Sequence, residues 1–233
     1  MGFKNYDGKI IKNAFIKSVP IMCSYLFVSM AYGMMMEEAG FPWYYSLAIS
    51  LTVYTGAFQF ILITFLSSGA SILTIALTAF FMNSRQTFYS ISFVDEFREM
   101  GKRMPYMIHT MTDETYAVNL TLDSVGKEKE DTMFLVALFS RCYWMLGAVV
   151  GGVLGQVIPF DMEGIDFCMT ALFLIIFIDQ WEKNKNHVPA VLGLAVAIIC
   201  LLLIGPQNFM LPALLMVSGM LLLQRQNEEK NNG

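Results

Sequence analysis

Asn83 and Arg85 lie near the middle of residues 70–94, a stretch that is otherwise largely apolar and about long enough to cross a lipid bilayer. An arginine at mid-membrane costs about 2.5 to 3.5 kcal/mol even on the mildest insertion scale, so it normally faces a partner or a water-filled cavity. Its guanidinium group could bind a substrate carboxylate in a fork, with Asn83 orienting the substrate or bonding freed backbone groups. We therefore interpret both as substrate-binding residues. The alternative is a structural ion pair, for which the chain offers Asp113, Glu114 and Asp179.

Gly56 and Gln59 form a second polar site within an apolar segment. Glycine permits close backbone approach, and a glutamine amide both donates and accepts hydrogen bonds, which would suit a zwitterionic substrate. Equally, Gly56 could pack against a neighbouring helix while Gln59 makes one interhelical hydrogen bond. The residues themselves leave both interpretations open.

Two neighbouring acids, Asp113 and Glu114, follow Thr112, a good N-cap residue for a helix whose first turn they would occupy. Capping and the helix dipole explain this arrangement without any further role. If the segment lies in the core of a membrane protein, either acid could accept a proton and couple transport to a gradient. Asp179 ends an apolar segment, where an acid opposes the helix dipole, and is a third proton-coupling candidate.

The overall composition is that of an integral membrane protein. Of the 233 residues, 56% are hydrophobic and 15% are charged, and the mean hydropathy is +0.54. A net charge of -4 without a basic stripe argues against nucleic acid as a partner. The cysteines occur singly, without the paired spacing of a zinc or iron–sulfur site. The chain has no HExxH motif, nucleophile elbow or serine–histidine pair at helical spacing, so we expect neither an enzyme nor a cofactor.

Hydropathy predicts an all-α polytopic membrane protein with six to seven transmembrane elements in a single domain over residues 1–233. One long hydrophilic stretch, residues 95–131, is too short to be a separate domain. The apolar segments are residues 14–36, 43–65, 70–94, 132–158, 164–181, 188–204 and 209–223.

The distribution of lysine and arginine predicts a cytoplasmic amino terminus, and it also places the turn with Lys183 and Lys185 and the carboxyl tail inside. Three full crossings would then put Arg98 and Arg103 outside, against the same rule. One early segment is therefore not a simple span. Either a hairpin re-enters the membrane, or residues 105–122 cross it.

The second and third apolar segments are candidates for a broken or re-entrant helix, with breaks at residues 55–57 and 83–85. Non-helical backbone at membrane depth persists only where it is buried in protein or lines a cavity, and transporters use such breaks at their substrate sites. The sequence does not choose between a kinked span and a hairpin.

Gly147, Gly151 and Gly155 recur at every fourth position in the fourth segment and predict a helix-packing face. Whether the neighbouring helix belongs to this chain or to another is left open. Arg141, a charge in the same segment, could extend toward the cytoplasmic surface.

The order of these motifs resembles the AzlC-type branched-chain amino-acid permease family: a glycine–glutamine break, Asn-Ser-Arg followed by Phe-Tyr-Ser at 88–90, then Thr-Asp-Glu at 112–114. The resemblance covers residues 14–122 and continues by hydropathy, with a weaker match at residues 179–181. It implies the large subunit of an exporter of leucine, isoleucine, valine or related compounds, working with a small hydrophobic AzlD-type subunit. The family positions carry over to Gly56, Gln59, Asn83, Arg85, Asp113 and Glu114.

Two departures from the family pattern bear on the substrate site. Phe58 stands where the family often has a smaller residue, which would narrow the site. Gln86 follows Arg85 where a histidine is common, which leaves the carboxylates as the coupling groups.

We predict a proton-driven secondary transporter of the bacterial cytoplasmic membrane, alternating its access by the rocking of two halves that could form a weak inverted repeat. The alternative is a non-transporting membrane subunit that stabilises or regulates a partner through its glycine face. That hypothesis predicts assembly without substrate binding. A channel would differ by flux that does not saturate.

Overall fold

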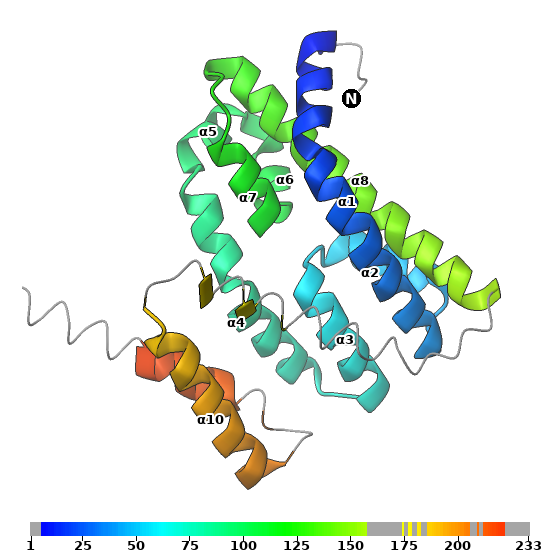
Figure 1. Cartoon of the computed structure of the whole chain (residues 1–233), viewed down its shortest axis with the longest axis vertical. Helices are drawn as coiled ribbons and strands as arrows, with labels where there is room; N and C mark the ends of the chain where they lie inside the picture. Colours follow the sequence, from blue (N-terminus) through cyan, green and yellow to red (C-terminus); the bar gives the residue numbers. More distant parts are fainter. Residues whose placement is uncertain are drawn as a thin grey trace, which may run out of the picture. The chain divides into compact units, whose positions relative to one another are not determined.

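The computed structural model describes residues 6–157, 174, 177–178, 181–182, 186–205, 209 and 212–221, and in these residues every regular element is helical (Figure 1). The chain divides into two compact units. The first comprises Met1–Ser68 and Asn83–Cys168, and the second comprises Gly69–Met82 and Met169–Gly233. The predicted all-α class is thus confirmed for the described part of the chain.

The two longest helices, α1 (Gly8–Glu38) and α8 (Gly126–Val157), form the frame of the first unit and run side by side (Figure 1). They have 31 and 32 residues, and within the described ranges they are the two helices long and apolar enough to cross a membrane. At about 1.5 Å per residue, each exceeds the roughly 30 Å hydrocarbon core. The larger number of spans predicted from hydropathy stays a prediction.

The glycine face of α8 lies against α1 of the same chain. A Cβ atom added at Gly151 would lie 2.7 Å from the Met30 Cα, and one added at Gly147 would lie 2.9 Å from the Leu26 carbonyl oxygen. At Gly155 the nearest atom would be the Glu37 Cβ, at 3.2 Å. The small residues therefore let the two helix backbones approach closely, and this face is occupied within the chain.

The second apolar segment is interrupted, because residues 53–55 separate α2 (Trp43–Thr52) from α3 (Gly56–Ser68), slightly earlier than the predicted break at 55–57. Arg141 of α8 reaches this break, and its Nη2 donates a hydrogen bond to the Leu51 carbonyl in the last turn of α2. The guanidinium carbon also lies 5.8 Å from the Tyr54 ring centroid. Arg141 thus satisfies a carbonyl that the break leaves open, and a cation suits the negative end of a helix dipole.

The third apolar segment has no break at residues 83–85, so that expectation is wrong. Helix α4 (Ile72–Ile91) continues through Asn83, Ser84 and Arg85. The side chains of Asn83 and Arg85 do not disrupt the backbone hydrogen bonds of the helix, because both have their surroundings outside it. Arg85 reaches an acid on another helix, and Asn83 faces a cavity.

The hydrophilic stretch folds into short helices: α5 (Val94–Glu99), the 3-10 helix η2 (Gly101–Arg103), α6 (Met104–His109) and α7 (Asp113–Leu120). At about 1.5 Å per residue, neither α6 nor α7 alone reaches across a bilayer core, and a crossing by residues 105–122 stays a prediction. These elements share a core with α8, formed by Phe93, Phe97, Met100, Met107, Met111, Leu122, Met133 and Ala137.

Two ion pairs fix this helical cluster to the start of α8. Arg103 Nη1 lies 2.6 Å from Asp131 Oδ1, and Lys129 Nζ lies 2.9 Å from Glu96 Oε1. The hydrogen bond from Lys129 holds the pKa of the Glu96 carboxyl below its usual value. The segment is therefore attached through charge as well as through its apolar core.

In the second unit, α10 (Val188–Ile204) and the short helix Pro212–Leu221 contribute to one small core. Val196 and Cys200 of α10 are buried together with Ala213.

Candidate functional site

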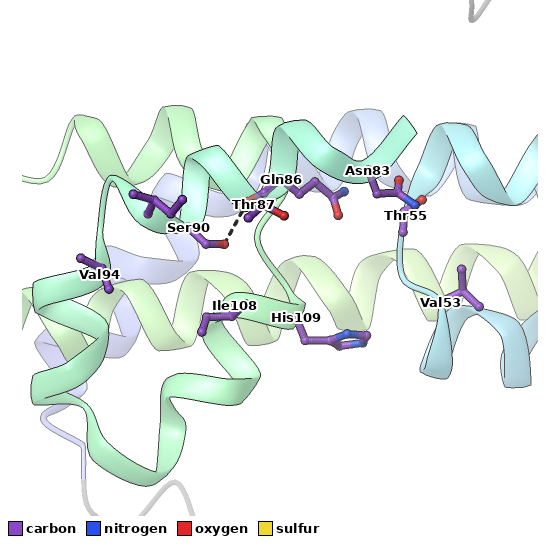
Figure 2. Close-up of a pocket in the computed structure, with 10 residues that line it drawn as sticks. Val53, Thr55, Asn83, Gln86, Thr87, Ser90, Val94, Ile108 and His109 are labelled. Carbon is purple, nitrogen blue, oxygen red and sulfur yellow. Dashed lines mark hydrogen bonds between the residues drawn. The ribbon is translucent and has the colours of Figure 1, made fainter. Parts of the chain in front are cut away.

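A cavity of about 360 Å³ lies within the first unit, between α4 on one side and the α2–α3 connection with α6 on the other (Figure 2). Its α4 residues follow the spacing i, i+3, i+4, i+7 and i+8, because these positions share one helix face. Cavities that hold small ligands usually fall between about 300 and 1,000 Å³. The described lining residues are Val53, Thr55, Asn83, Gln86, Thr87, Ser90, Ile91, Val94, Ile108 and His109.

The chemistry of this lining is mixed and carries no carboxylate or guanidinium group among those residues. Hydroxyl and amide groups supply hydrogen-bond donors and acceptors, chiefly from Thr55, Asn83, Gln86 and Thr87. Valine and isoleucine side chains supply an apolar surface. Such a lining can bind a small molecule that has an aliphatic body and a polar, overall neutral head.

Asn83, predicted from the sequence as a substrate-binding residue, lines this cavity, whereas Arg85 does not. Arg85 Nη1 donates to Asp113 Oδ2 at 2.6 Å, with about a third of each side chain exposed (38% and 35%). The ion pair that the sequence offered as an alternative is therefore present, and it connects α4 to the first turn of α7. Direct contact of Arg85 with substrate stays a prediction.

Gly56 and Gln59 both contact the indole ring of Trp144 on α8. Trp144 Nε1 donates to Gln59 Oε1 at 2.7 Å, and Gln59 Nε2 lies 3.4 Å from Ser50 Oγ. A Cβ atom at Gly56 would lie 3.0 Å from Trp144 Cη2. Because Gln59 is fully buried with both ends of its amide engaged, the pair fixes the start of α3 against α8. Nothing in the sequence pattern marks Trp144 as the partner.

The two acids of α7 have different partners. Thr112 caps the helix, exchanging hydrogen bonds with Thr115. Asp113 binds Arg85 of α4, whereas Glu114 Oε2 accepts a hydrogen bond of 2.7 Å from the Tyr25 hydroxyl of α1. The first turn of α7 therefore connects α1 with α4. Asp179, the third acid predicted from the sequence, lies outside the described residues.

Arg141 supports the cavity wall that faces α4. It contacts Leu51 in the last turn of α2 and Tyr54 in the α2–α3 connection, and its guanidinium carbon also lies 5.5 Å from the Tyr106 ring centroid on α6. The α2–α3 connection and α6 contribute lining residues opposite α4. Arg141 therefore has partners within the protein, and its position relative to the membrane surface stays a prediction.

Comparison with known proteins places this chain in a family. The model of the family described as AzlC protein matches residues 20–158, more than half of the chain. The chain belongs to the AzlC family. The matched residues include both sides of the cavity, the break between α2 and α3, and the α1–α8 frame.

Individual relatives of this AzlC family member cover from 72% to 94% of the chain. An uncharacterized membrane protein of Helicobacter pylori is 39% identical over 222 residues, 94% of this chain and 97% of the relative. The branched-chain amino acid transport protein AzlC of Bacillus subtilis is 36% identical over 220 residues, 94% of this chain and 87% of that protein. The inner membrane protein YgaZ of Escherichia coli is 28% identical over 178 residues, 72% of each chain. No solved structure matches this chain.

Proposed function

We propose that this protein is a secondary transporter that exports branched-chain amino acids or related small amino acids and is driven by protons. The observation that carries the proposal is the cavity beside the broken α2–α3 element, lined by neutral hydrogen-bonding groups and aliphatic side chains. Family membership and the transport name of the Bacillus subtilis relative support it. The chemistry needed is binding and release, so we propose no enzymatic activity.

In this proposal the head of the amino acid binds the polar part of the cavity. The amides of Asn83 and Gln86 can donate to its carboxylate, and hydroxyl groups can complete the shell. Val53, Ile91 and Ile108 offer the apolar surface that a branched side chain needs. Each buried CH₂ group of such a side chain gains about 0.8 kcal/mol, which favours aliphatic over polar substrates.

The other sequence-predicted residues would shape this site. Gly56 and Gln59 hold the start of α3 against α8, and Arg85 holds α4 to α7, so each would act on the cavity through an element that lines or adjoins it. Asp113, Glu114 and Asp179 remain the proposed carboxylate candidates for proton coupling. Glu114 is the most exposed of the two described acids and is bound to a neutral hydroxyl group.

We further propose that residues 1–233 form one transmembrane domain with six to seven membrane elements and a cytoplasmic amino terminus, in a bacterial cytoplasmic membrane. The α2–α3 element would be the broken or re-entrant one, since broken helices commonly form transporter substrate sites. Two halves rocking around the site, related by an inverted repeat, would give alternating access. A small hydrophobic AzlD-type subunit would complete the transporter.

The test is uptake of labelled leucine, isoleucine, valine and methionine into inverted membrane vesicles. It is made with and without the small subunit and with an imposed proton gradient. Saturable uptake that needs the partner and collapses with the gradient is the expected result. Asn83→Ala should lower it at least about tenfold, because a hydrogen bond to a charged group contributes about 1.5 to 3 kcal/mol. Asn13→Ala, on α1 and outside the cavity, is the matched control.

If the assembled pair takes up none of these amino acids, the proposed substrate class is wrong. Uptake that never saturates would instead indicate a channel.

The alternative is a non-transporting subunit that stabilises or regulates a partner. It needs a contact surface other than the glycine face of α8. The face with Gly147, Gly151 and Gly155 packs on α1 of the same chain. This hypothesis predicts full assembly with the partner and no amino-acid binding, and it predicts that combined replacement of Gln59 and Arg85 leaves the assembly's activity intact.

A further inference from the structure

His109 is a lining residue of the cavity that the sequence pattern did not single out. It is the last residue of α6, its side chain is exposed to the cavity, and it lies on the side opposite Asn83 and Gln86 of α4 (Figure 2). An exposed position allows protons to reach the imidazole from water. A position across from the amides allows a bound molecule to contact both sides at once.

Among the described lining residues, His109 is the one whose charge changes near neutral pH. The others are aliphatic or carry hydroxyl and amide groups, which keep the same charge throughout the physiological range. An unperturbed histidine titrates with a pKa of about 6.5. The state of this single imidazole therefore decides whether the lining is neutral or carries one positive charge.

The charged surroundings of His109 favour its neutral form. Partial burial of the imidazole, and after it the positive charge of Arg141 on α8, lower the pKa of His109. Tyr106 on α6 and Tyr54 in the α2–α3 connection lie against Arg141 and are neutral phenols. From α4, the residues that line the cavity are uncharged, and Arg85 is paired with Asp113.

We propose that neutral His109 accepts a hydrogen bond from the ammonium group of the bound amino acid, and that a proton on His109 displaces this group. The inference rests on the proposed transport function and adds a proton-binding residue within the substrate cavity itself. The ammonium group and the proton compete for one nitrogen lone pair, while the amides of Asn83 and Gln86 receive the carboxylate. Competition of this kind is what a transporter needs to exchange protons for substrate.

Linkage fixes the sign of the effect. Because the proton and the substrate exclude each other, protonation must weaken substrate binding and substrate binding must release the proton. Below the pKa of His109, the apparent dissociation constant should rise about tenfold for each pH unit, and above that pKa it should be constant.

The experiment is equilibrium binding of labelled leucine to the purified chain with its small subunit, between about pH 5 and pH 8. Wild type should bind more weakly as the pH falls, and His109→Gln, which keeps a hydrogen-bonding side chain but cannot titrate, should bind with the same affinity throughout. His187→Gln is the matched control, because His187 is the other histidine of the chain and lies in the second unit. It should keep the wild-type pH dependence.

A second variant guards against misfolding of the first. His109→Asn likewise keeps a hydrogen-bonding amide that cannot titrate, so it should also bind leucine with an affinity that does not change with pH. An unchanged pH dependence in His109→Gln, or tighter binding at low pH in wild type, would overturn the inference while leaving the transport proposal standing. Absence of leucine binding by wild type at every pH would overturn both.

Discussion

Replacement of Gly151 by alanine tests the packing of α1 on α8, on which the rest of the first unit is built. The added methyl group would lie 2.7 Å from both the Cα and the carbonyl carbon of Met30. Ordinary contacts of a Cβ atom begin at 3.4 Å, and these obstructing atoms are backbone atoms that cannot rotate aside. The two helices must therefore separate, which forfeits dispersion contacts along the interface.

The magnitude follows from two opposing effects. Overpacking a tight interface costs about 1 to 3 kcal/mol, and a backbone obstacle favours the upper end of that range. Alanine also stabilises the helix by up to about 1 kcal/mol relative to glycine, because it has the higher helix propensity. We expect Gly151→Ala to lower the free energy of unfolding by about 2 kcal/mol.

Two other glycines provide graded controls in the same chain. A Cβ atom at Gly155 would meet the flexible Glu37 side chain at 3.2 Å, and one at Gly193 in α10 would meet nothing within 4 Å. Gly155→Ala should therefore cost less than about 1 kcal/mol, and Gly193→Ala should be neutral or stabilising by up to about 1 kcal/mol.

The assay is reversible unfolding by a denaturing detergent, followed through tryptophan fluorescence, for wild type and the three variants. The expected order of stability is Gly193→Ala, then Gly155→Ala, then Gly151→Ala. Equal stabilities, or a larger loss at Gly155 than at Gly151, would refute the assignment of the glycine face to α1.

Two further predictions concern polar contacts. Trp144→Phe removes the donor to Gln59 Oε1 and leaves a buried amide oxygen unpaired. It should therefore lower the free energy of unfolding by about 1 to 3 kcal/mol. The control Trp181→Phe, in an exposed position, should change the free energy of unfolding little. The Glu96–Lys129 pair gives a pH-dependent contribution. Because the folded pKa of Glu96 lies below its usual value, the stabilisation is full above the unfolded pKa of about 4.3 and is lost as the pH falls through the folded pKa. Glu96→Gln should therefore be less stable than wild type at pH 7, by at most about 1 kcal/mol, with the difference vanishing at acid pH in the same unfolding assay.

Several features could be predicted from the sequence because they depend on local chemistry. Three glycines spaced by four residues place small side chains on one helix face, whatever the partner. Thr112 before two acids predicts the start of α7, where capping and the helix dipole act within one turn. A glycine in a polar interruption predicts the break between α2 and α3, because the backbone there has no strong local preference for helix.

Other features were decided by contacts between residues far apart in the chain. Asn83 and Arg85 do not break α4, because a cavity and the carboxylate of Asp113 supply partners that the local sequence does not reveal. The glycine face of α8 packs on α1. The side chain of Gln59 accepts a hydrogen bond from Trp144, and Arg141 donates one to the end of α2. His109 reaches the same cavity as Gln86 because α6 folds back toward α4.

The sequence by itself determined which residues are polar within apolar segments, and so which residues could do chemistry. Only the tertiary structure decided which of them meet, since an ion pair, a buried hydrogen bond and a cavity each need two elements brought together by packing that no local pattern encodes.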